Sequence, residues 1–223
     1  QYIFYSKLDQ NHRPRKIYRH KLGTNPKIDQ LIFEEKSEAF TVGIGLSSDE
    51  KYFFINTSDH NTSEKYYFSV NEETPKPKLI RSREKGIIYS INSWDNYFYM
   101  HTNKDAEDFK IERCKDINAQ KWETFIAPKE ETLIGSLLFL NKWIVRSEVT
   151  NALDKIFVKN IEGPLNHLSN NWTFADKKNG ITEITFDIDF EIKNKFLNSL
   201  MVVSFQFGLE KIADAFQKRA EEL

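Results

Sequence analysis

YFFINTSDHNTSEKYYFSV, residues 52–70, decides the fold of this chain. Its two ends, YFFINTS and KYYFSV, are rich in the aromatic and β-branched residues that strands favour. The middle, SDHNTSEK, collects Ser, Asp and Asn, whose side chains hydrogen-bond the local backbone in turns. The stretch therefore predicts two antiparallel strands joined by a polar turn.

The same arrangement recurs along the chain. Its first strands begin roughly 45–50 residues apart, at Tyr2, Tyr52, Tyr97 and Trp143. Each is followed by a partner strand, in RKIYRHKL (15–22), KYYFSV (65–70), FKIERC (109–114) and KIFVKNI (155–161). Three pairs also have an apolar strand before them, in FTVGIGLS (40–47), GIIYSIN (86–92) and TLIGSLLFL (132–140). A short fourth strand ends these three units, in KLI (78–80), ETFI (123–126) and WTF (172–174).

Repeats of four short strands in 40–50 residues are typical of β-propeller blades. We therefore expect an all-β fold over residues 1–190, a partial β-propeller of about four four-stranded antiparallel blades. The first unit lacks its innermost strand, and TEITFDIDF (182–190) is expected to begin a fifth blade. Because a propeller closes with roughly four to eight blades, and this chain starts and stops in mid-blade, we expect it to be part of a larger propeller.

The last residues depart from this repeat. In 208–223 apolar residues recur at helical spacing, at Leu209, Ile212, Ala213, Phe216 and Ala220. The spacing predicts a divergent C-terminal tail, 191–223, that carries an amphipathic helix. The helix could pack on the open end of the sheet array, bind a partner, or be a non-native tail.

Bulk composition excludes several classes of protein. The 32 basic and 33 acidic residues give a net charge of −1, which argues against nucleic acid or an anionic membrane as a partner. No apolar run approaches the length of a membrane span, and the first ten residues lack the pattern of a signal peptide. The single cysteine, Cys114, cannot form an internal disulfide, so we expect a cytoplasmic protein.

The richest candidate for chemistry is HTNKDAEDFKIERC, 101–114. Within fourteen residues it gathers His101, Asp105, Glu107, Asp108 and Cys114. A calcium loop of the EF-hand type needs a central Gly and a different ligand spacing, and zinc sites need pairs of Cys and His. A thiolate nucleophile would need a nearby base and an electropositive setting. The stretch is therefore interpreted as the hairpin between the second and third strands of a blade, with a solvated tip.

Three other stretches receive structural interpretations. SDHNTSEK (58–65) occupies the equivalent hairpin of the preceding blade, and the basic run HRPRKIYRHK (12–21) that of the first blade. Gly43 and Gly45 lack the third Gly of a dinucleotide fingerprint and are interpreted as a close backbone approach or a bulge. The chain has neither G-x-S-x-G nor H-E-x-x-H. We therefore predict no catalytic, cofactor-binding or metal-ligating residue, and no cofactor.

The amino-acid sequences of the expected blades resemble those of a known family. NHRPRKIYRHKLGT (11–24), LIFEEKSEAFTVGIG (31–45), SSDEKYFFINTSDHNTSE (47–64), HTNKDAEDFKI (101–111) and KWETFIAPKEETLIGSLLFLNKWIVRSE (121–148) follow one another as in the N-terminal propeller of oligopeptidase B. This is the protease II group within the prolyl oligopeptidase family of serine peptidases. The resemblance covers about residues 1–190 and weakens after about residue 162.

The resemblance implies a seven-bladed propeller that covers an α/β-hydrolase domain and admits only small peptides, which are cleaved after Arg or Lys. The Ser-Asp-His triad and the residues that hold the basic substrate side chain belong to that hydrolase domain, so no catalytic residue is assigned here. We expect these 223 residues to be inactive alone. Alternatively, they are the binding half of a split enzyme that docks a separately encoded catalytic partner, or a vestigial gene fragment.

Overall fold

The structure is a computed structural model of the 223-residue chain. It describes residues 1–141, 143–160, 165–177 and 180–192, together with Gly208, Glu210, Lys211, Asp214, Ala215 and residues 217–219. The chain divides into two compact units, Gln1–Ser136 and Leu137–Leu223. The predicted domain division at residue 190 is a different one and stays a prediction.

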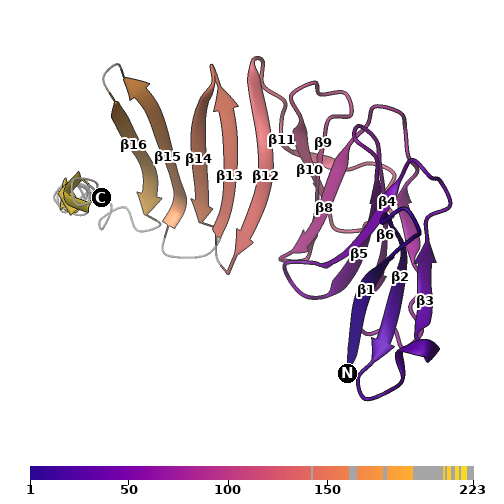
Figure 1. The fold of residues 1–223 in the computed structure, drawn as a ribbon. Helices are drawn as coiled ribbons and strands as arrows, with labels where there is room; N and C mark the ends of the chain where they lie inside the picture. The colour runs from indigo at the N-terminus through magenta and orange to yellow at the C-terminus, as the bar shows by residue number, and fades with distance from the viewer. Residues whose placement is uncertain are drawn as a thin grey trace. The chain divides into compact units, whose positions relative to one another are not determined.

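Strands dominate the described chain, and they form four antiparallel sheets (Figure 1). The first sheet contains β1 (Tyr2–Leu8), β2 (Pro14–Lys21) and β3 (Gln30–Glu34), with the short 3-10 helix η1 (Pro26–Ile28) before β3. The second contains β4 (Thr41–Leu46), β5 (Tyr52–Ser58), β6 (Ser63–Ser69) and β7 (Lys78–Arg81). The third contains β8 (Tyr89–Trp94), β9 (Tyr97–Thr102), β10 (Lys110–Cys114) and β11 (Glu123–Ile126). The fourth contains β12 (Thr132–Leu140), β13 (Trp143–Thr150), β14 (Leu153–Asn160), β15 (Leu165–Lys177) and β16 (Ile181–Ile192).

The prediction of partial propeller blades is confirmed. Strands follow the chain from one edge of each sheet to the other, as in a blade. The first sheet has three strands, which agrees with the expected loss of the innermost one. Several predicted strands match residue for residue, because their aromatic and β-branched side chains alternate between two covered faces.

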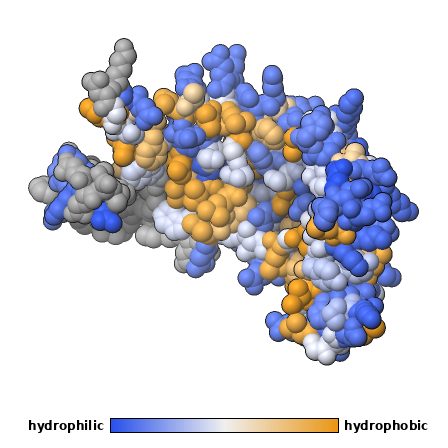
Figure 2. Space-filling view, in the orientation of Figure 1, coloured by the Kyte–Doolittle hydropathy of each residue, from blue (hydrophilic) through white to orange (hydrophobic). Residues whose placement is uncertain are grey.

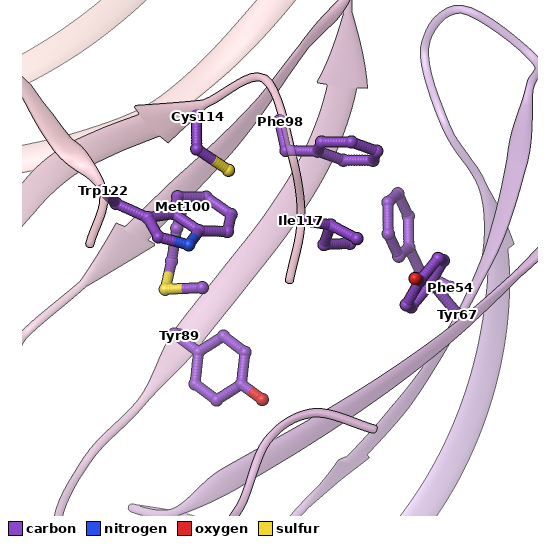
Figure 3. Packing of buried hydrophobic residues seen from close by; sticks show 8 residues of the cluster. All are labelled: Phe54, Tyr67, Tyr89, Phe98, Met100, Cys114, Ile117 and Trp122. Carbon is purple, nitrogen blue, oxygen red and sulfur yellow. The ribbon is translucent and has the colours of Figure 1, made fainter. Parts of the chain in front are cut away.

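The second sheet is apolar on both faces, since it packs between its two neighbours. Ile55 and Phe68 point toward the first sheet, where they join Ile17 and Val42 in one buried cluster. Alternate residues of the same strands point the other way. They join the third sheet in a cluster made of Phe54, Tyr67, Tyr89, Phe98, Met100, Cys114, Ile117 and Trp122 (Figure 3). Burial on both faces explains why strands such as YFFINTS lack a strict apolar–polar alternation.

One predicted strand has a different role from the one expected. The segment TEITFDIDF (182–190) does not begin a fifth blade, because β16 pairs along its length with β15 in the fourth sheet. The predicted fourth strand WTF (172–174) is correspondingly part of a strand of 13 residues. Lys177 pairs with Ile181, and Gly180, just before Ile181, has a φ of +72. Strands that follow each other so closely in the chain pair antiparallel.

The C-terminal helix is confirmed at the positions that the structure describes, which are helical and exposed between 208 and 219. The five apolar positions of its predicted amphipathic face, Leu209, Ile212, Ala213, Phe216 and Ala220, lie outside the described residues. Within the described part of the chain, no helix has both the length and the apolar composition that a membrane crossing requires.

Truncation of the buried side chain at Ile55, which is 0% exposed, tests the packing of the first two sheets. We expect Ile55→Ala to lower the free energy of unfolding by about 2–5 kcal/mol, because a cavity replaces apolar contacts. Urea denaturation followed by circular dichroism measures the change. Leu46→Ala, at a position 48% exposed in the adjacent strand, is the control and should cost less than about 1 kcal/mol. Equal costs at the two positions would contradict this packing.

Candidate functional site

His101 and Cys114, the two candidates with the most reactive chemistry, point to opposite faces of the third sheet. Cys114 lies opposite Phe98 in the pairing of β9 with β10, whereas His101 lies opposite Ile111. Because successive side chains of a strand alternate between faces, His101 and Phe98 face opposite ways. The imidazole therefore cannot act as a base for this thiol.

The thiol of Cys114 is buried among apolar side chains in the cluster between the second and third sheets (Figure 3). Burial raises its pKa to about 12, and the negative charge of Asp116 adds to the shift, against a smaller opposite effect of Arg81. At neutral pH the group is a protonated thiol, which is a poor nucleophile and a poor metal ligand.

The imidazole of His101 serves as a hydrogen-bond donor between structural elements. Its ring stacks on Phe109 with centroids 4.5 Å apart, and Nε2 lies 2.7 Å from the carbonyl oxygen of Ile134. A carbonyl oxygen only accepts hydrogen bonds, so Nε2 carries a proton. Burial lowers the pKa of His101, although this bond opposes the shift. The neutral ring thus ties β9 to the start of β12.

The acidic residues of the same hairpin do not converge on a common point. Asp105 and Glu107 are exposed, as predicted for a solvated tip, and Asp108 is half-buried. The carbonyl of Asp108 accepts a hydrogen bond from the amide of Ile134 at 2.9 Å. Among the residues that the structure describes, no group of three or more His, Cys, Asp or Glu side chains could hold a metal ion.

The hairpin SDHNTSEK is a turn, but its second half is not solvated. The carboxylate of Asp59 accepts from the amides of Asn61 (2.9 Å) and Thr62 (2.7 Å), and these bonds hold the pKa of Asp59 below its usual value. Residues 62–65 are buried, because the segment that enters the third sheet runs across them. The hydroxyl of Ser63 accepts from the amide of Tyr89 at 2.8 Å and donates to its carbonyl at 3.2 Å.

The arginines of the basic run bind the protein's own backbone. Arg13 donates to the carbonyls of Glu38 (2.8 Å) and Ala39 (3.2 Å). Arg15 donates through Nε and Nη2 to the carbonyl of Glu35, at 3.1 and 2.9 Å. Both contacts hold the segment that leads from β3 to β4. The side chains of Arg13 and Arg15 line a polar hollow of about 360 Å³, and its walls also include Glu34 and Glu38.

The interpretation of Gly43 and Gly45 was wrong. Both lie in β4, which pairs with β5 in regular register, so there is no bulge. A Cβ atom added at either position would meet nothing within 4 Å, so no close approach requires glycine there.

A hollow of about 350 Å³ lies between the second and third sheets. Its walls combine the aromatic rings of Tyr52, Tyr67 and Phe98 with charged residues that include Lys78 and Lys115. The hydroxyl of Tyr67 donates to Oδ1 of Asn118 at 3.3 Å across the hollow's edge. Aromatic rings beside ammonium groups could bind a flat or anionic group, but the lining presents no nucleophile with a base.

Sequence reasoning missed a group of three charged residues that contact one another in the first compact unit. The Nη2 atom of Arg83 lies 2.8 Å from Oε2 of Glu35 and 2.8 Å from Oε1 of Glu64. The guanidinium also covers the ring of Phe40, with 4.0 Å to its centroid. Glu35 and Glu64 are 5% and 7% exposed. We call Arg83, Glu35 and Glu64 the Arg83 cluster; its members are far apart in the sequence, so no local motif could have revealed it.

Charge in the Arg83 cluster is stabilised by hydrogen bonds. Burial pushes the pKa of Glu64 upward, but bonds from Arg83 and from Tyr66 (2.7 Å) outweigh it, so the pKa lies below its usual value of 4.5. The same surroundings raise the pKa of Tyr66 to about 12, through burial and then through Glu64. The amide of Ser37 donates to Glu35 at 2.8 Å. Glu64 and Arg83 are therefore both charged at neutral pH, since the pKa of Glu64 is lowered and hydrogen bonds to the two carboxylates raise that of Arg83.

Removal of the Arg83 guanidinium would leave two buried carboxylates without their cation. We expect Arg83→Met to lower the free energy of unfolding by about 2–4 kcal/mol at pH 7, a range reduced because 30% of the Arg83 side chain is exposed. The native Glu64 pKa is lowered, so the cluster's stabilisation is present above pH 4.5 and is lost as the pH falls through the native pKa. The difference between variant and parent should therefore shrink in acid.

Denaturation in urea at pH 7 and at a series of acidic pH values measures both effects. Lys16→Met, which removes the exposed pair with Glu34, is the control and should change stability little. A penalty for Arg83→Met that is independent of pH would argue against a charged cluster.

The buried thiol offers a second test. We expect Cys114 in the native chain to react with a thiol reagent at pH 8 on the order of a hundredfold more slowly than in denaturant, because burial excludes the reagent and suppresses the thiolate. Absorbance of the released thiolate measures the rate. The chain in denaturant is the control and should release one equivalent, since it has one Cys. Rapid, complete reaction of the folded chain would contradict the burial of Cys114.

Comparison with known proteins confirms the resemblance seen in the sequence. The family model described as prolyl oligopeptidase, N-terminal beta-propeller domain, matches residues 1–183. Protease 2 of Moraxella lacunata is 30% identical over 169 residues, which are 75% of this chain and 24% of that protein. The chain thus spans about a quarter of that relative's length.

Two further matches concern the fold and a shorter segment. Oligopeptidase B from Trypanosoma brucei, solved with covalently bound antipain in a closed form, superposes with a TM-score of 0.67 at 17% identity, over 87% of this chain and 34% of that one. This likeness shows the propeller fold. The ribosome association toxin RatA of Rickettsia prowazekii is 31% identical over 83 residues, which are 37% of this chain and 56% of that protein.

Proposed function

The chain belongs to the prolyl oligopeptidase N-terminal β-propeller family, and from this premise we propose that it is the substrate-gating part of an oligopeptidase B-like serine peptidase. The identity of 30% with Protease 2 over most of the chain carries the proposal. Proteins of this family join the propeller to a catalytic hydrolase domain in one chain. The substrates, as the resemblance implies, are small peptides cleaved after Arg or Lys.

Gating by size requires a wall that does not yield to a large substrate. The aromatic cluster between the second and third sheets and the Arg83 cluster support such rigidity, because close-packed interiors resist deformation. Polar contacts at the hairpins, such as those of Ser63 and His101, hold successive strands and connections together. These features suit a scaffold that excludes folded proteins from a covered active site.

Catalysis is assigned to the hydrolase partner and not to these residues. Acyl transfer needs a nucleophile, a base within reach of it and oxyanion donors. In the described chain, Cys114 is protonated and His101 is bonded to a backbone carbonyl on the opposite face. The hydrolase domain is the proposed partner, within one longer chain or, alternatively, as a separate chain, and the lone thiol supports a cytoplasmic location.

A fluorogenic peptide with Arg or Lys before the scissile bond tests the assignment. We expect no turnover by the purified 223-residue chain above the buffer blank, with full-length Protease 2 as the positive control. Turnover that a serine-directed inhibitor abolishes would overturn it. Co-purification with a stoichiometric hydrolase chain would favour the split enzyme, whereas broad, non-cooperative melting would favour the vestigial fragment.

A further inference from the structure

The fourth sheet has one charged face and one apolar face. Cross-strand partners place Glu148, Lys155, Thr173 and Thr185 on the same side. The same side carries the pair Lys177–Glu183 and the guanidinium of Arg146, which bonds Glu148 at 2.7 Å and covers the ring of Phe157. The charges on this side are paired with one another, and Glu148 is only 2% exposed.

The opposite side of this sheet is apolar. Register places Val158, Ile156 and Trp172 on it, together with Phe174, Ile184 and Phe186. Trp172 and Phe186 pack with ring centroids 4.3 Å apart. Ile156, Phe174 and Ile184 are nevertheless 37%, 38% and 49% exposed. Figure 2 shows hydrophobic residues gathered over this part of the molecule. A surface of this kind marks a docking site, and it invites aggregation when it is left uncovered.

The second compact unit contains a segment suited to cover this face. We propose that the C-terminal helix, 208–219, packs on the apolar face of the fourth sheet, so that the chain from Leu137 onward forms a two-layer module of its own. The helix positions that the structure describes, among them Glu210, Lys211 and Lys218, are exposed. From the sequence alone, the helical spacing of Leu209, Ile212 and Phe216 predicts that these three apolar residues share one side.

The dimensions of helix and sheet agree. A helix of twelve residues is about 18 Å long, and five strands are about 19 Å wide. The connecting residues 193–207 can extend to about 50 Å, more than enough to bring the helix across either face.

The module also differs from a blade in its strands. β15 and β16 have 13 and 12 residues, whereas the strands of the second and third sheets have 4 to 7. In a propeller the neighbouring blade covers each sheet face. With its own helix in that position, the fourth sheet would not offer its apolar face to a following blade or to a second copy of the chain. The inference is independent of the proposed peptidase function.

Cysteine pairs in a Cys114→Ala background test the contact. Ile184→Cys and Phe174→Cys, on the apolar face, are each combined with Phe216→Cys or Leu209→Cys. Thr185→Cys, next to Ile184 but on the charged face, is the matched control, as is Lys218→Cys on the helix. After mild oxidation, peptide mapping identifies disulfides within a chain, and gels without reductant identify those between chains.

We expect at least one apolar-face pair to form the disulfide within one chain on the order of tenfold more than the Thr185 control does, because packing raises the local concentration of the two thiols. Equal yields from the two faces, no product within one chain, or product mainly between chains would overturn the proposal. Product between chains would identify a second copy as the occupant.

A second measurement does not depend on disulfide geometry. Phe216→Glu should increase the fluorescence of a hydrophobic dye severalfold by exposing the apolar face, while Lys218→Glu should leave it unchanged. Urea midpoints confirm that both variants remain folded at the start of the measurement. Equal dye binding by the two variants would also overturn the proposal.

Discussion

The guanidinium of Arg83 lies between two buried carboxylates, and the stacking of the first two sheets depends on this contact. Glu35 belongs to the segment between β3 and β4, Glu64 to β6, and Arg83 to the segment between β7 and β8. An ionised carboxylate in a buried position requires a cation and hydrogen bonds. Arg83 supplies the cation and a hydrogen bond to each of the two carboxylates. The two connecting segments are therefore held in one arrangement, and the aromatic rings between them can pack.

The same logic recurs at each hairpin between the second and third strands. Arg13 holds the segment that enters the second sheet, Ser63 the segment that enters the third, and His101 the start of β12. A connecting segment leaves the sheet ladder and exposes its carbonyls and amides, which need partners when they are buried. Side chains typical of active sites, a hydroxyl and an imidazole, here satisfy backbone groups.

Much of the fold could be predicted from local pattern. Segments such as YFYMHT (97–102) and ETFI (123–126) are strands as expected, because their side chains suit a pleated, covered surface. The role of β16 could not be predicted, since an apolar strand is equally compatible with a new blade and with a hairpin to β15. The Arg83 cluster was missed because its members lie in one strand and two separate connecting segments, which meet only in the folded chain.

The amino-acid pattern alone established an all-β chain of repeated aromatic strands, its likeness to a peptidase propeller and the hairpin position of HTNKDAEDFKIERC, because period, turn chemistry and repeat length are local properties. Tertiary structure decided the rest. It placed His101 and Cys114 on opposite faces, buried half of SDHNTSEK and bonded the basic side chain of Arg13 to a backbone carbonyl. These outcomes depend on which segments are covered by distant ones, and burial, unlike strand formation, arises only when the sheets pack together.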